Sequence, residues 1–276
     1  MPSDLNDLNA GRGQAPDLAM TSLPLFDEAA FADRVDIVAR ARSLLSHPGF
    51  AGMIKAMASD LIAVFEASPR LGKLLGSYRR WFMVQIGFAL HARTSGPGHE
   101  DGLTASRLAS LLEGQGLASR NTVSNFIAEM VAYRLLVPVP GSEGGRSRPL
   151  MPTESAVGAM AKWLGSNLAA LDRLDGGSRH DMFAERVDLL APVQMRIVDQ
   201  LMANRDWMVP GARIMNFLGR DSGGLVLDGL IAGLDLDFAG SGRLPVGRIN
   251  ISQMARRFQL SRINLDRMLK KALENG

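Results

Sequence analysis

The side chains with the clearest chemical potential lie in two short segments that share an order of residue types. In each, a serine is followed by arginine and then by asparagine within three residues. Arginine can pair with two acceptors of guanine, asparagine can pair with adenine, and serine or threonine can bond to phosphates. The candidate contacts to double-stranded DNA are therefore Ser119, Arg120, Asn121, Thr122, Ser124 and Asn125 in the first segment, and Ser261, Arg262, Asn264, Arg267, Lys270 and Lys271 in the second.

The first segment has the pattern of a capped helix that follows a glycine turn. In the stretch that begins at Leu103, a short amphipathic helix is predicted from Leu108, Ala109, Leu111 and Leu112. It stops at Gly114 and Gly116 because glycine tolerates turn conformations. Ser119 is placed to cap the first turn of a second helix. The apolar residues of that second helix recur on one helical face, and we predict that they are buried: Val123, Phe126, Ile127 and Met130.

A β-hairpin is predicted directly after this helix. Residues 135–139 form an apolar run typical of a strand, residues 141–145 are a glycine-rich turn, and residues 146–151 form the returning strand. Arg146 and Arg148 lie close to the turn. We expect these two arginines to act as an arm that contacts the DNA backbone or the minor groove.

This order of helix, turn, capped helix and arginine-bearing hairpin resembles the winged helix-turn-helix of MarR-type regulators. The resemblance rests on LASRNTVS at 117–124, YRLL at 133–136 and RSRPLMPT at 146–153, within a region of about a fifth of the chain. It implies that the second helix enters the major groove of DNA and that the protein regulates transcription. It also raises the expectation of a small-molecule effector, although no residue identifies one.

The second part of the chain resembles the first. FAERVDLLA at 183–191 matches FADRVDIVA at 31–39 with six identities in nine, and residues 251–276 repeat the helix, turn and capped-helix pattern. Residues 248–274 carry seven basic and two acidic side chains, which predicts a basic stripe. Counting from the first copy, a wing and a closing helix should follow Gly276. The second copy therefore lacks its wing, or the sequence is truncated.

These patterns predict a mainly α protein with two tandem helix-turn-helix domains, leading helices and a small β-hairpin wing. Residues 1–24 are polar and are expected to form a disordered tail. Residues 25–175 form the first predicted domain, and residues 176–276 form the second. An offset of roughly 150 residues is too long for a solenoid repeat and fits a domain duplication.

Composition permits a nucleic-acid partner and argues against several other classes. The formal net charge is +3 and the sequence pI is about 9.6. The chain has no cysteine and four scattered histidines, so we expect no disulfide, metal or other cofactor. No common phosphate-binding or nucleophile motif is present, and we expect no enzymatic activity. Without a secretory signal or an apolar run long enough to span a membrane, the predicted location is the cytoplasm of a prokaryote.

Other arrangements remain open at this stage. Two recognition helices in one chain could meet successive major grooves, whereas homodimerisation through the leading helices is the competing arrangement. A plasmid-type replication initiator with tandem winged helices would also use two unequal recognition helices. Alternatively, the two units could be protein-interaction modules, as in chromosome-condensation complexes. The charge on the predicted recognition helices favours DNA binding, because interaction modules tend to lose such charge.

Overall fold

A computed structural model of the chain describes residues 34–67, 72, 76–94, 102–142, 148–208, 210–238 and 244–275, the side chains of 34–38, 205 and 206 excepted. Most of these residues are helical, which confirms the prediction of a mainly α protein. The predicted tail at 1–24 lies outside the described residues. The helices are α1 (Arg34–Leu45), α2 (Phe50–Ala67), α4 (Tyr78–Thr94), α5 (Ala105–Gly114), α6 (Arg120–Ala132), α7 (Glu154–Asp175), α8 (Arg179–Glu185), α9 (Leu190–Ala203), α10 (Arg205–Met208), α11 (Ala212–Leu218), α12 (Gly223–Ala232), α13 (Ile251–Arg257) and α14 (Arg262–Glu274).

One small sheet accompanies the helices. Strands β1 (Leu136–Pro138) and β2 (Leu150–Pro152) pair antiparallel, with Val137 opposite Met151. Leu103 forms an isolated antiparallel β-bridge with Leu150 of β2, since its carbonyl accepts a hydrogen bond of 2.7 Å from the backbone N–H of Leu150. The predicted short amphipathic helix is α5, which begins at Ala105 behind the cap Thr104 and buries its apolar stripe.

The first hydrophobic core packs α4 against α5, α6 and the hairpin, and it also takes in α9. Val198 and Leu201 of α9 are buried in this core, where α9 packs on α4. Two polar pairs join α9 to α4 within this core: Gln194 donates to the side-chain oxygen of Gln85, and Arg93 forms an ion pair with the carboxylate of Asp199. Buried polar groups need such partners, so these pairs fix how α9 lies on α4.

The second core packs α12 and α11 against α13 and α14, and it takes in α2. Phe65 of α2 meets Phe258 edge to face, with ring centroids 6.1 Å apart. Near the two ends of α2, Lys55 donates to the carbonyl of Leu234 at 2.6 Å, and Glu66 pairs with Arg257 at 2.7 Å. This helix therefore belongs to the second core, although in sequence it precedes every helix of the first core.

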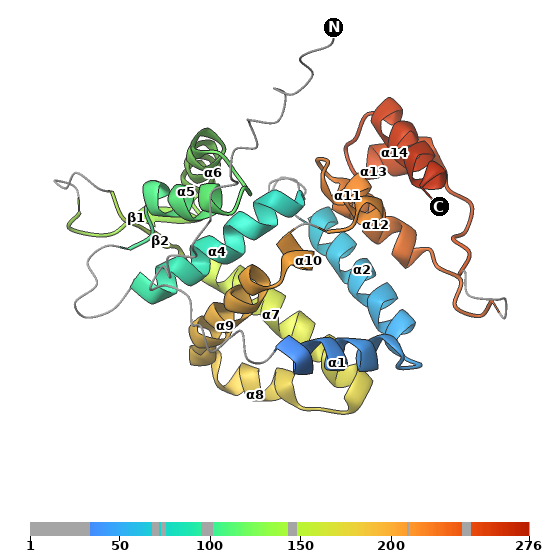
Figure 1. Cartoon of the computed structure of the whole chain (residues 1–276), viewed down its shortest axis with the longest axis horizontal. Coiled ribbons are helices and arrows are strands. Elements are labelled where there is room, and N and C mark those ends of the chain that lie inside the picture. The colour runs from blue at the N-terminus through green and yellow to red at the C-terminus, as the bar shows by residue number, and fades with distance from the viewer. Residues whose placement is uncertain are drawn as a thin grey trace, which may run out of the picture.

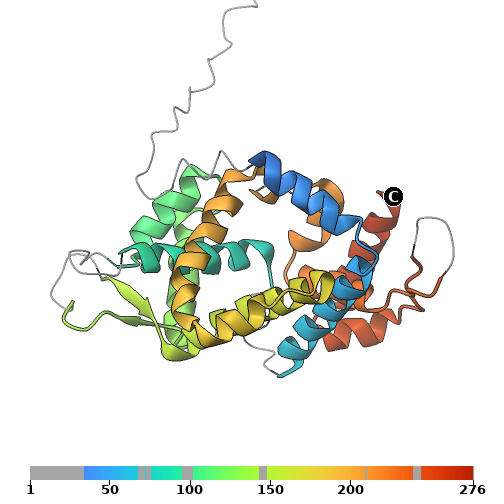
Figure 2. The same ribbon diagram turned by 90° about the horizontal axis from the view of Figure 1, so that it is seen from below.

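Two helices thus pack outside the predicted domain to which their sequence belongs, an arrangement that we call the exchange (Figure 1). Helix α2 comes before the first helix pair (α5 and α6) but lies on α12, and α9 comes before the second pair (α13 and α14) but lies on α4. Helix α7 runs beneath both units and packs on α2 and α8 (Figure 2). Each core therefore contains a helix from the other predicted domain, which joins the two parts of the chain more firmly than a linker would.

The nine-residue repeat does not mark equivalent local structure. Residues 34–39 lie within α1, whereas their matches at 186–191 include Arg186, which is not helical, and the 3-10 turn Val187–Leu189. The helices that correspond in packing are α2, which lies on α12, and α9, which lies on α4. Sequence identity over nine residues therefore locates a similar segment without fixing its conformation.

A pair of neighbouring substitutions in α2 tests the exchange. Ile62 is 3% exposed in the second core, whereas Leu61 beside it is 44% exposed. We expect Ile62→Ala to lower the free energy of unfolding by about 2–5 kcal/mol, because it removes buried apolar surface and leaves a cavity. Leu61→Ala should cost under about 1 kcal/mol. Urea denaturation measures both, and equal losses would contradict this position of α2.

Asp228 on α12 gives a pH-dependent test of the same core. Burial raises its pKa from 3.8 to about 7, so the folded protein keeps a proton that the unfolded chain releases. The free energy of unfolding should therefore fall as the pH rises from about 4 to about 7. Asp228→Asn should flatten this fall, and chemical denaturation at pH 5 and pH 7 measures it. An identical pH dependence in both proteins would refute the assignment.

Candidate nucleic-acid interface

The first helix pair, α5 and α6, is held at its turn by backbone and capping bonds. Gly116 has a φ of +67°, and the N–H of Leu117 donates to the carbonyl of Leu112 at 2.9 Å. This left-handed residue with a six-to-one bond is a Schellman ending, which redirects the chain after α5. Ser119 then accepts a hydrogen bond from the N–H of Thr122 at 3.3 Å. The prediction that Ser119 caps a helix is confirmed.

Helix α6 presents two different faces. The buried side is the stripe Val123, Phe126, Ile127 and Met130, as predicted. The opposite side is exposed and carries Arg120, Asn121, Ser124 and Asn125, which we call the α6 face. Thr122 is only half-buried, and its hydroxyl lies 2.9 Å from that of Ser119. Ser119 and Thr122 therefore serve the helix start, and the other four side chains point to solvent.

Two ion pairs set the charge around the α6 face. Arg120 lies 3.0 Å from the carboxylate of Glu113 on α5, and the two side chains remain 71% and 50% exposed. At the other end of the face, Arg80 of α4 pairs with Glu129, and this bond lowers the pKa of the Glu129 carboxyl. The negative charge of Glu129 is thus balanced by Arg80, and the pair holds α6 against α4. The exposed pair between Arg120 and Glu113 can open at little cost.

The second helix pair, α13 and α14, repeats the same turn with different residues. Gln259 has a φ of +55°, and the N–H of Leu260 donates to the carbonyl of Ala255 at 2.9 Å. Ser261 caps α14 by accepting from the N–H of Asn264 at 3.1 Å, as predicted. The six-to-one bond therefore occurs at both turns, which makes the two helix pairs locally equivalent.

Helix α14 carries the more basic surface. Leu265 and Met268 are buried, and the predicted contacts on the outer side are all exposed: Arg262, Asn264, Arg267, Lys270 and Lys271, which we call the α14 face. Asp266 pairs with Lys270 at 2.9 Å. Ile263 lies beside these residues and is 70% exposed, so this apolar side chain makes little contact with its own protein.

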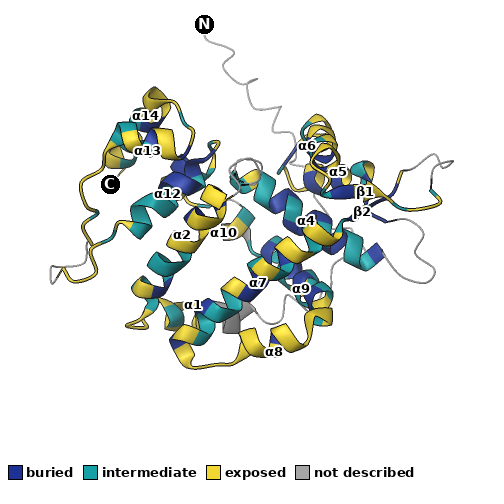
Figure 3. Ribbon diagram, turned by 180° about the vertical axis from the view of Figure 1, so that it is seen from behind, coloured by how far each residue is buried: buried dark blue, intermediate teal, exposed yellow. Residues whose placement is uncertain are grey.

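The two faces stand apart at one edge of the molecule. Helices α6 and α14 lie at the two upper corners in Figure 1, and the view from behind in Figure 3 shows the same arrangement with α1 and α8 at the opposite edge. The structure therefore does not bring all candidate residues into a single site. It places the two helices that carry the polar faces near the same edge of the molecule (Figure 1).

The hairpin extends beside the first helix pair. Arg148, which immediately precedes the buried Pro149 and Leu150, is exposed. Arg146 lies outside the described residues. The predicted hairpin is present, and only one of its two candidate arginines can be placed.

Two further features can be stated for the described part of the chain. No group of three or more His, Asp or Glu side chains there is arranged to hold a metal ion. No described helix is both long enough and apolar enough to cross a membrane. Comparison of the chain with known protein families, with characterised proteins and with solved structures finds no match.

The capping serines provide a test of local structure that is independent of ligand binding. Ser261→Ala removes the acceptor for the first turn of α14 and should lower the free energy of unfolding by about 1 kcal/mol. Ser261→Asn keeps a side-chain acceptor and should stay close to the original protein. Urea denaturation of the three proteins decides this. If the alanine and asparagine variants are equally destabilised, the cap contributes nothing.

Proposed function

We propose that the protein binds double-stranded DNA through the α6 and α14 faces and acts as a sequence-specific regulator of transcription. In this proposal, α5 with α6 and α13 with α14 are two helix-turn-helix units, and the β1–β2 hairpin is the wing of the first. The observation that carries it is the exposure of both faces. Arginine and asparagine side chains lie near the start of each helix, where helix-turn-helix proteins contact base edges.

The two faces have different charge and therefore different expected tasks. The α14 face carries Arg262, Arg267, Lys270 and Lys271, which suits contacts to phosphates as well as bases. The α6 face has Arg120 beside Asn121, Ser124 and Asn125, a set better suited to hydrogen bonds with base edges. Unequal faces of this kind would read two unlike half-sites, so the proposed operator is asymmetric.

The exchange of α2 and α9 supports simultaneous binding. Because each core contains a helix from the other unit, the spacing of α6 and α14 is set within one folded chain. Regulators with one recognition helix per chain reach adjacent major grooves, about 34 Å apart, by forming symmetric dimers. Here one chain would supply both recognition helices, so binding to two adjacent major grooves would not require a homodimer.

The competing class is a protein-interaction module, and the salt dependence of binding separates the two. Several phosphate contacts should make log K for duplex DNA fall with log[salt] at a slope of several units. Fluorescence anisotropy with a labelled duplex of random sequence at increasing KCl concentrations measures this slope. Absence of binding, or binding insensitive to salt, would favour the interaction module.

Arg120 and Arg267 test the two faces separately. Arg120→Ala and Arg267→Ala should each weaken binding to a selected DNA fragment by about 1–3 kcal/mol if they read bases. The matched control is Arg42→Ala, which removes an exposed arginine from α1 at the opposite edge of the molecule (Figure 1). That control should bind almost as the original protein does. Unchanged affinity in both test variants would remove the site assignment.

A substitution at Glu113 should raise the affinity for DNA, whereas the two arginine substitutions should lower it. Its carboxylate holds Arg120 and places negative charge beside the α6 face. Glu113→Gln removes that charge at nearly constant shape, so DNA affinity at low salt should rise by roughly two- to fivefold, the range of an exposed ion pair. Anisotropy titrations at low and high KCl measure the effect, which should shrink at high salt. A lower affinity would mean that Glu113 positions Arg120 for binding.

A further inference from the structure

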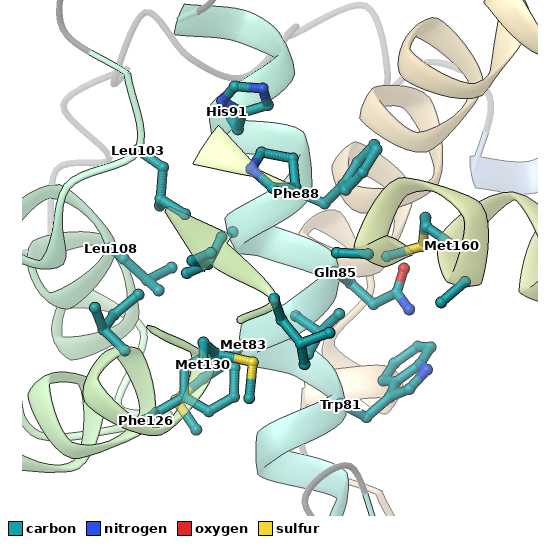
Figure 4. A pocket seen from close by; sticks show the side chains of 18 of the residues that line it. Trp81, Met83, Gln85, Phe88, His91, Leu103, Leu108, Phe126, Met130 and Met160 are labelled. Atoms are coloured by element: carbon teal, nitrogen blue, oxygen red, sulfur yellow. The ribbon is translucent and has the colours of Figure 1, made fainter. Parts of the chain in front are cut away.

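A cavity of about 170 Å³ lies inside the first unit, between α4, α6, the hairpin and α7 (Figure 4). A protein cavity of about 150 Å³ lined by apolar side chains stays free of water and binds benzene. The cavity here is similar in size. It is therefore large enough for one small ring, and its contents depend on the chemistry of its wall.

The wall is almost entirely apolar. Phe88, Phe126 and Met160 contribute to three of its sides, as Figure 4 shows. Gln85 supplies the side-chain amide, whose oxygen already accepts a hydrogen bond from Gln194. His91 is the titratable residue of the wall, and burial lowers its pKa, which keeps the imidazole neutral at pH 7. No Lys, Arg, Asp or Glu of the described residues lines the cavity, so a charged ligand would lose its hydration without compensation.

The cavity is accessible between α4 and α7. Trp81 and Phe88 of α4 and Trp163 of α7 line it while only half-buried, and Ala159 of α7 is exposed. Trp81 and Trp163 meet edge to face with ring centroids 6.2 Å apart. Aromatic walls favour an aromatic guest, because rings gain from offset or edge-to-face contacts.

We propose that this cavity binds one small, uncharged monocyclic aromatic molecule. The guest would contact Phe126, Ile127 and Met130, the buried stripe of α6, on the opposite side of the helix from Arg120. Binding itself does not depend on the proposed DNA contacts, so it can be tested without DNA.

The intrinsic fluorescence of the protein reports on this site. The three tryptophans of the chain are neighbours, since Trp81 also stacks on Trp207 with centroids 6.3 Å apart. Toluene should change tryptophan fluorescence in a saturable way and raise Tm with its concentration, as any ligand of the folded state does. Benzoate at the same concentration has the same ring with a charge and should do neither. Failure of toluene to saturate, or an equal effect of benzoate, would overturn the proposal.

Two variants place the guest inside the cavity. Ala156→Leu adds bulk to the cavity wall and should weaken toluene binding at least tenfold, whereas Ser166→Leu, exposed on the same helix, should leave it unchanged. Gly87→Ala covers the case in which Ala156→Leu does not fold. Its new methyl group would lie 3.9 Å from Leu103 and from Leu108, an ordinary contact, and it should weaken binding severalfold. If the folded variants bind toluene as tightly as the original protein, the guest lies elsewhere.

Discussion

The structure depends on the exchange of α2 and α9 between the two units. Ile62 and Phe65 complete the core beneath α14, and Val198 and Leu201 complete the core around α4. Removing either helix would uncover apolar surface in the other copy, which costs free energy in proportion to the area exposed. Folding of each helix pair is thereby coupled to folding of the other, and the two outer faces acquire a defined spacing.

The same constraint explains why two unequal faces can coexist in one chain. A symmetric dimer presents the same helix twice, whereas this chain presents Arg120 with a nearby carboxylate on one side and a cluster of basic residues around Arg267 on the other. The Arg80–Glu129 pair anchors α6 to α4, and Asn216 donates to the carbonyl of Met268, which anchors α14 to α11. Internal bonds therefore fix each helix while its outer side stays exposed.

Local features could be predicted from the sequence, and distant partnerships could not. The helix starts at Ser119 and Ser261 follow from a capping serine before a helical apolar stripe, which are short-range signals. The exchange joins α2 to a core more than 150 residues away, and Arg80 pairs with Glu129 across 49 residues. Neither of these long-range contacts leaves a signal in the neighbouring sequence. Gln259 adopts a φ that usually favours glycine, so the turn at 259 had no residue marker either.

Footprinting of a single chain on DNA decides whether one chain places both helix pairs on the duplex. A fragment selected from genomic DNA would be probed with hydroxyl radicals at a protein concentration where sedimentation shows one chain per fragment. We expect two protected patches about 10 base pairs apart on one side of the duplex, one for each helix pair. A single protected patch for one bound chain, or two patches that form only when two chains bind, would contradict it.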